Sequence, residues 1–112
     1  MSDVTLVALH SALTGISLRQ RVIADNIANI NTPGYHAKRV EFESALAGAV
    51  SEGTGAASAT VGTSLEPTRL DGNNVNLDHE TLANVDSNLR YQLMLRAVDS
   101  KFGLLRDSLR TS

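Results

Sequence analysis

The feature that most constrains this chain is a pair of long segments, one toward each end, in which apolar residues recur at steps of three and four. The first covers about Thr5 to Ile30. This spacing places the apolar side chains on one stripe of an α-helix, as in a heptad seam. The stripe contains Leu6, Leu9, Leu13, Ile16, Ile23, Ile27 and Ile30, with Gln20 as a polar interruption. A helix of this length would be roughly 37 Å long.

A second helical pattern covers about Leu77 to Arg110. Asn76 is placed as its N-cap, and Asp78 and Glu80 put negative charge in the first turn, where the helix dipole favours it. The main seam contains Tyr91, Leu95, Val98, Phe102, Leu105 and Leu109, and a neighbouring stripe contains Leu82, Val85, Leu89 and Leu93. The apolar face is therefore broad enough to contact more than one partner helix.

Between the helices, residues 47–64 read AGAVSEGTGAASATVGTS, a stretch with almost no charge and no aromatic ring. We expect it to be flexible, because it cannot bury enough surface to offset its ordering entropy. The predicted fold is mostly α, with long N- and C-terminal helices packed as a coiled-coil hairpin around an irregular or flexible middle segment. The expected divisions are an N-terminal axial helix at 1–31, a turn, extended segment and flexible linker at 32–76, and a C-terminal axial helix at 77–112.

Two helices with broad apolar seams and a loose linker make a poor core on their own. Further copies or partners would supply the missing surfaces, which favours an assembly subunit over an enzyme. A formal net charge of −2 argues against a nucleic-acid partner. The absence of cysteine excludes disulfides and thiolate metal sites. We see neither a signal-peptide pattern nor an apolar run of the roughly 18 residues that a membrane span needs.

The residues that could carry chemistry do not form a known constellation. His79 and Glu80 begin like a zinc-protease motif, but Ala83 stands where the second histidine is needed. His10 and His36 are far apart in the sequence, so we expect all three histidines to be solvated. The segment DGNNVNLDHE, residues 71–80, fails as a calcium loop because the position that requires glycine is asparagine. No catalytic, metal or cofactor site is predicted.

The charged residues in the helical segments and after the first helix have ordinary interpretations. The small basic groups Arg19 with Arg21, and Lys38 with Arg39, are typical of solvated faces. Asp86 lies four residues before Arg90 and favours an ion pair on one helix face.

The end of the first helical segment contains more capping and turn-forming residues than ending a helix requires. In NTPG, Pro33 suits position i+1 and Gly34 position i+2 of a type II turn. Thr32 precedes proline and is therefore pushed away from the α region. The crowded residues are Asn26, Asn29, Asn31, Thr32, Pro33, Gly34 and Tyr35.

At these residues the chain resembles the flagellar rod, hook and hook-associated axial proteins of bacteria. ADNIANINTPGY, residues 24–35, is similar to their signature Ala-Asn-Asn-Ile-Ala-Asn-x-x-Thr-Pro-Gly-Tyr, with Asp25 at a common asparagine position. HAKRVEFE, residues 36–43, looks like the extension of the proximal rod subunits. A second motif of these subunits stands here as Asp71, Gly72, Asn73, Val75, Leu77 and Glu80. Residues 88–109 resemble their C-terminal helix.

The resemblance implies a non-enzymatic structural subunit of the basal-body proximal rod, part of the drive shaft and central export channel. Such subunits form a helical homo-oligomer with other rod proteins, and link the MS ring and type III export gate to the distal rod and hook. The adaptor FliE is a further implied partner. They are exported unfolded, without a cleaved signal peptide, to the periplasmic side of the inner membrane. No cofactor, nucleic acid or membrane span is implied.

We hypothesise that the N-terminal seam pairs with the C-terminal seam within and between subunits. The Asn-Thr-Pro-Gly-Tyr turn would aim residues 35–43 outward, against a neighbouring subunit. Three alternatives stay open: another flagellar rod subunit, a soluble coiled-coil adaptor or chaperone that forms a closed oligomer, and a small metal-dependent enzyme that uses the three histidines.

Overall fold

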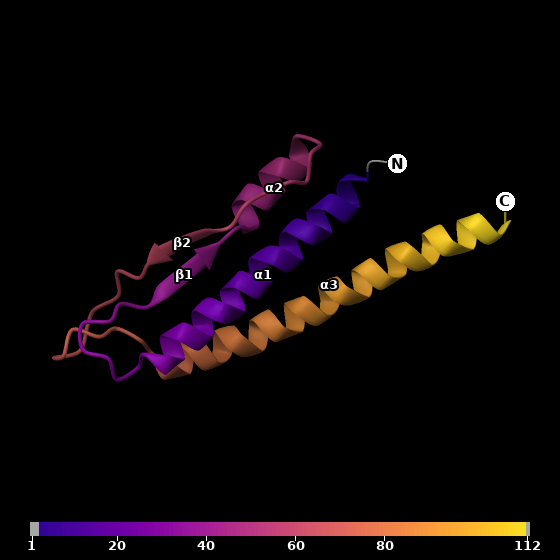
Figure 1. Cartoon of the computed structure of the whole chain (residues 1–112). Coiled ribbons are helices and arrows are strands. Elements are labelled where there is room, and N and C mark those ends of the chain that lie inside the picture. Colours follow the sequence, from indigo (N-terminus) through magenta and orange to yellow (C-terminus); the bar gives the residue numbers. More distant parts are fainter. Residues whose placement is uncertain (1–2, 112) are drawn as a thin grey trace.

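A computed structural model describes residues 3–111. The elements follow the chain as α1 (Val4–Ala28), β1 (Lys38–Glu41), α2 (Glu43–Ser51), β2 (Thr60–Thr63) and α3 (Leu77–Thr111). The two long helices run antiparallel as a hairpin in an elongated molecule of 66 × 25 × 14 Å (Figure 1). The predicted mostly α fold with long terminal helices is confirmed. Within the described residues, no helix combines the length and apolar character that crossing a bilayer needs.

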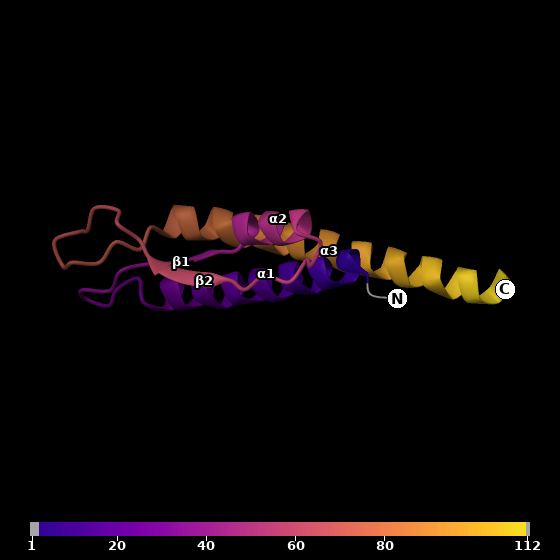
Figure 2. The same ribbon diagram turned by 90° about the horizontal axis from the view of Figure 1, so that it is seen from above.

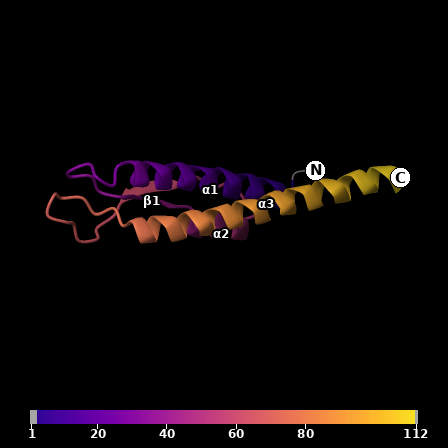
Figure 3. The same ribbon diagram turned by 90° about the horizontal axis from the view of Figure 1, so that it is seen from below.

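Both long helices begin at side-chain caps. The Asp3 carboxylate accepts the Thr5 backbone N–H at 2.8 Å, and the Asn76 side chain accepts the His79 N–H at 3.1 Å. Each cap satisfies one of the backbone donors that a helix start leaves unpaired. Asp3 also pairs with Lys101 at 2.6 Å. Beyond that pair α3 continues past the N-terminal end of α1 (Figure 3).

α1 is the central element of the molecule. The strands and α2 lie on one side of it and α3 on another (Figures 1 and 2). The buried cluster where these parts meet contains Ala12, Ile16, Val22, Val40 and Phe42, and the α3 residues Tyr91 and Met94 pack against it. The Phe42 ring lies directly on Gly15, where an added Cβ would be 2.6 Å from ring carbons. Gly15 is therefore needed for this close approach and is not merely a weak position in the helix.

Part of the middle segment has regular structure that its composition did not indicate. β2 pairs antiparallel with β1, with Val61 opposite Val40, and residues 48–51 complete α2. The loop between α2 and β2 is held on α1, because the Ser11 hydroxyl donates to the Gly55 carbonyl at 2.9 Å. Backbone and side-chain partners from other parts of the chain thus offset the ordering entropy that these small residues could not offset alone.

The expectation that residues 35–43 point outward is wrong. After the turn the chain folds back along α1 as β1, and Ala37, Val40 and Phe42 are buried. The reason is the alternation of apolar side chains along this stretch, which places one face of the strand against α1.

Candidate functional site

The two sequence motifs meet at one end of the hairpin, where Asn73 connects them. Its side chain is fully buried. The Asn73 amide nitrogen donates to the carbonyls of Asn29 at 2.8 Å and Thr32 at 2.9 Å. Its oxygen accepts the Val75 N–H at 2.7 Å. The second motif therefore pairs carbonyl groups at and just after the end of α1, a place where a helix leaves acceptors unpaired.

Asn26 connects α1 to β1 through its side-chain hydrogen bonds. It is also fully buried. Its side-chain amide pairs with both backbone groups of Lys38: it donates to the carbonyl at 3.0 Å and accepts the N–H at 2.9 Å. The Tyr35 hydroxyl donates to the same oxygen at 3.4 Å. Asn26 thus fixes where the first strand begins against the helix.

Asn74 joins the start of β1 to the end of β2, and the sequence prediction missed it. Its oxygen accepts the Ala37 N–H at 2.6 Å, and its nitrogen donates to the Ser64 and Glu66 carbonyls at 3.2 and 3.0 Å. The second motif, as the resemblance defines it, does not include this position. The run of two asparagines, both buried here, was the only signal available in the sequence.

The turns that carry the two motifs touch each other. Gly34 has φ +75°, and the Tyr35 N–H donates to the Thr32 carbonyl at 3.2 Å, as a type II turn requires. Gly72 has φ +82°, and a Cβ there would be 3.3 Å from the Gly34 Cα. The Gly34 N–H donates to the Asp71 carbonyl at 2.8 Å. Both glycines are needed, one for the bend and the other also for the contact.

The remaining motif residues divide into exposed and supporting positions. Asn31 and Pro33 are exposed, as are Asp71 and Leu77. Asn29 contributes locally: its side chain donates to the Asp25 carbonyl at 2.8 Å and accepts the Thr32 hydroxyl at 3.0 Å.

Arginine side chains complete the junction. Arg69 donates to the carbonyls of Ile30 and Val75 at 2.5 and 2.6 Å. Arg39 pairs at 2.8 Å with Glu80, whose side chain is only 1% exposed. A buried carboxylate needs such a partner, so the interpretation of Arg39 as a solvated residue is wrong.

Arg19 was likewise expected to be solvated, and this is also wrong. It forms a bidentate pair with Glu43 at 2.6 and 2.7 Å and donates to the Val40 carbonyl at 2.6 Å. Its guanidinium also lies 4.8 Å from the centre of the Phe42 ring. The hydrogen bonds from Arg19 lower the pKa of Glu43 to about 2. These contacts hold α2 and the strand before it on α1.

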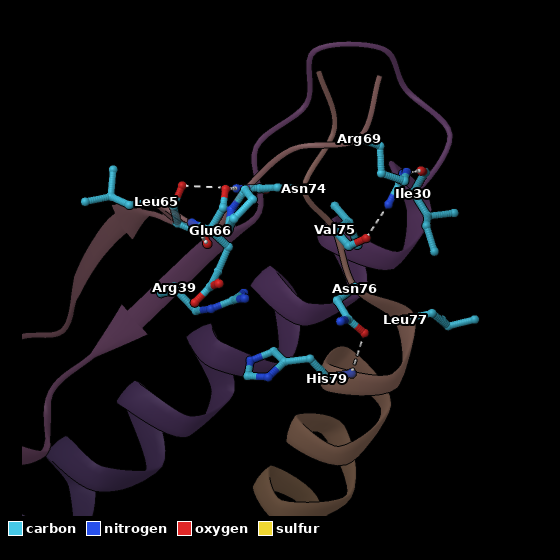
Figure 4. Close-up of a pocket in the computed structure, with 12 residues that line it drawn as sticks. Ile30, Arg39, Leu65, Glu66, Arg69, Asn74, Val75, Asn76, Leu77 and His79 are labelled. Atoms are coloured by element: carbon cyan, nitrogen blue, oxygen red, sulfur yellow. Dashed lines mark hydrogen bonds between the residues drawn. The ribbon is translucent and has the colours of Figure 1, made fainter. Parts of the chain in front are cut away.

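A recess of about 1000 Å³ lies beside the junction, between residues 64–69 and the start of α3. Its lining is mixed, with Arg39, Glu66 and His79 among apolar residues (Figure 4). Arg39 is already paired with Glu80, and the Asn76 side chain caps α3. His10, His36 and His79 lie apart from one another in the chain and are exposed. Among the described residues, no group of three or more side chains is arranged to hold a metal ion.

The structure brings together only part of the two predicted helical seams. On α1, Ile16 and Ile23 are buried, whereas Leu6, Leu9, Leu13 and Ile27 are half-buried. On α3, Tyr91, Val98 and Leu105 are half-buried, whereas Leu95, Phe102 and Leu109 are exposed. The neighbouring stripe of Leu82, Val85, Leu89 and Leu93 is exposed along its length. Much of the apolar surface of α3 is therefore uncovered in the single chain.

Sequence comparisons with known proteins agree on the class of protein to which this chain belongs. The family model described as "Flagella basal body rod protein" matches residues 6–36. The chain is 34% identical over 121 residues to the flagellar basal body rod protein FlgB of Escherichia coli (strain K12), covering 88% of each chain. It is 29% identical to FlgB of Bacillus subtilis (strain 168), covering 91% of this chain and 90% of the relative.

A shorter match, 54% identical over 37 residues, joins the chain to FlgB of Borreliella burgdorferi and covers 33% of this chain and 27% of the relative. The chain belongs to the FlgB family of flagellar basal body rod proteins. It is a structural subunit of the proximal rod of the flagellum.

Proposed function

We propose that this subunit forms part of the drive shaft and of the wall of the central export channel, in a helical assembly of copies with other rod proteins. It acts without catalysis, on the periplasmic side of the inner membrane, after export without a cleaved signal peptide. Its neighbours are a FliE-type adaptor, the MS ring and the type III export gate. α1 and α3 serve as the axial helices of the expected divisions 1–31 and 77–112, and residues 32–76 brace them. Residues 1, 2 and 112 of these divisions lie outside the described residues.

One observation carries the proposal: α3 has apolar side chains on two faces, and α1 covers only one of them. Leu82, Val85, Leu89 and Leu93 are all more than half exposed, at 72, 60, 58 and 53%. Large exposed apolar patches mark interaction surfaces. In contrast, the buried asparagines of the junction are hydrogen-bonded inside the chain. The exposed stripe residues therefore serve contacts between subunits, and the motif residues serve the shape of each subunit.

The first test is deletion of the gene in the source bacterium, with basal bodies imaged by electron cryo-tomography. An inner-membrane ring with no rod above it supports the proposal. A partial rod would assign the protein to a position higher in the axis, that is, to another rod subunit. Intact flagella would contradict the rod role and favour a soluble adaptor, which would form a closed oligomer at every concentration. Stoichiometric zinc in the purified protein would instead favour the metal-enzyme alternative.

A pair of variants tests the surface itself. Leu89→Asp places a charge in the exposed stripe and should abolish swimming when it replaces the natural gene. Asn84→Asp places the same charge at an exposed position five residues earlier, about 140° around the helix from Leu89 at roughly 100° per residue, and a strain with this variant should swim. Circular dichroism of both purified proteins separates lost assembly from lost folding. Normal swimming by the Leu89→Asp strain would contradict a subunit contact through this stripe.

A further inference from the structure

The C-terminal end of α3, residues 102–111, has apolar side chains that the described part of its own chain leaves largely exposed. We call it the overhang. α1 begins opposite Lys101, because Asp3 at its N-cap pairs with Lys101 at 2.6 Å. The overhang therefore projects past α1 (Figure 1). Phe102 is 55% exposed and Leu109 79% exposed, although both continue the helical stripe that packs on α1 further back.

At the same end of the molecule lies an apolar groove. It has a volume of about 290 Å³, with α1 as its floor and α2 and α3 as its walls. The lining residues are Val4, Thr5, Ala8, Leu9, Ala12, Leu46, Val50 and Met94. None of them is charged, and the side chains of Ala8 and Ala12 are small enough for another helix to approach α1 closely.

We infer that the overhang of a second copy of this chain occupies the groove. This contact would deepen the assembly role proposed above and rests on it. Met94, Val98, Phe102, Leu105 and Leu109 follow one another at helical steps of four and three. Met94 already packs against the α1 core. The residues that follow it in this row, from Val98 to Leu109, therefore suit an apolar α1 surface of the same kind. A second copy supplies that part, since each overhang projects away from its own groove.

The charges beside the two surfaces are opposite in sign. Arg106 and Arg110 flank the apolar stripe of the overhang. Glu52 is the C-cap of α2 and is exposed at the groove end where Val50 lies. The negative end of the α2 helix dipole adds to its field. An incoming overhang thus meets an uncharged floor and an acidic rim.

The overhang and the groove are different surfaces, so the contact is heterologous. Each copy would offer one overhang and one groove, and an association of this kind continues from copy to copy unless a rotation closes it. The consequence is an open chain of subunits, in contrast to a closed dimer.

Sedimentation velocity over a concentration series tests the contact with the full chain. Wild type should grow in mass as its concentration rises. Phe102→Asp should weaken self-association by at least about tenfold, as loss of a central apolar anchor does. Leu104→Asp is the matched control, because Leu104 is an overhang leucine that is 66% exposed, against 55% for Phe102. Leu104 lies on the side of the helix away from Phe102 and Leu109. Ala8→Trp fills the groove and should act like Phe102→Asp, whereas Ala24→Trp, at an exposed position of α1 outside the groove, should not.

Mixing the two blocked variants gives the sharpest result. Ala8→Trp keeps a free overhang and Phe102→Asp keeps a free groove, so the mixture should form one-to-one dimers and stop there. Wild type that stays monomeric at its highest soluble concentration, or a mixture that stays monomeric, overturns the inference. Unchanged assembly of Phe102→Asp overturns it as well.

Complementation of the deletion strain separates this inference from the proposed function. If the deletion strain lacks a rod and Phe102→Asp restores it, the rod role holds and the groove contact is wrong. If the deletion strain builds complete flagella, the rod role fails regardless of what the purified protein does.

Discussion

The contact between Gly15 and Phe42 makes a quantitative prediction about Gly15→Ala. Glycine to alanine inside a helix normally stabilises a protein by about 1 kcal/mol. Here the new methyl group would lie 2.6 Å from two ring carbons of Phe42 and 2.9 Å from a third, well inside the roughly 3.5–4.0 Å optimum for carbon atoms. The ring cannot move away easily, because Phe42 is buried and Arg19 lies across it at 4.8 Å.

Relieving this overlap costs about 1–3 kcal/mol, the usual range for overpacking. The propensity gain offsets only part of it, so Gly15→Ala should lower the free energy of unfolding by about 1 kcal/mol. Gly48→Ala is the matched control: Gly48 is also helical, and a Cβ there would have no neighbour within 4 Å. It should raise the free energy of unfolding by up to about 1 kcal/mol.

Urea unfolding followed by far-ultraviolet circular dichroism measures both effects. The double variant Gly15→Ala with Phe42→Leu should lose less than the sum of the two single variants, because leucine leaves room for the methyl group. The reasoning is refuted if Gly15→Ala stabilises the protein as much as Gly48→Ala does and shows no coupling to position 42.

Three further predictions concern polar contacts. Asn73→Ala should lower the free energy of unfolding by about 2–3 kcal/mol, because it leaves two carbonyls and an N–H without their partner, whereas exposed Asn31→Ala should change it little; equal urea midpoints would contradict this. The pKa of Glu43 is about 2 in the folded chain and 4.5 ordinarily, so its contribution to stability is complete above about pH 4.5 and is lost as pH falls toward 2. In Glu43→Gln the melting temperature should therefore depend less on pH between about 4.5 and 2 than in the wild type. An unchanged dependence on pH would count against the ion pair with Arg19. Gln20 donates to Asn88 at 2.6 Å across the two long helices; replacing both by leucine should raise the melting temperature but permit other registers, detected by cysteine cross-linking between α1 and α3.

The two long helices were predictable because a repeated apolar stripe over many residues has few other solutions. The side of α3 that meets α1 was not. Met94 and Leu95 are neighbours on a broad apolar face, and the structure packs Met94 inward while Leu95 is 41% exposed. Periodicity identifies the face, but the neighbouring strands and the small residues of α1 decide which part of it is covered.

The asparagine-rich motif shows a second limit. Its density correctly indicated a specified junction, but Asn26 is fully buried and Asn31 is exposed. Their partners lie on other segments, and no local pattern distinguishes the two. β2 was missed for the same reason, since its order comes from pairing with β1 and not from its own composition.

The bonds made by Asn73 have a consequence for the order in which the molecule can take shape. They link residue 73 to a carbonyl that lies 44 positions earlier in the chain. Closing so long a loop costs entropy that no local contact returns. When the chain emerges with its N-terminus first, the end of α1 stays open until the second motif has followed. A partly released chain therefore lacks the bonds that close the junction until nearly two-thirds of the polypeptide is free, and the hairpin forms only after α3 (Leu77–Thr111) has followed.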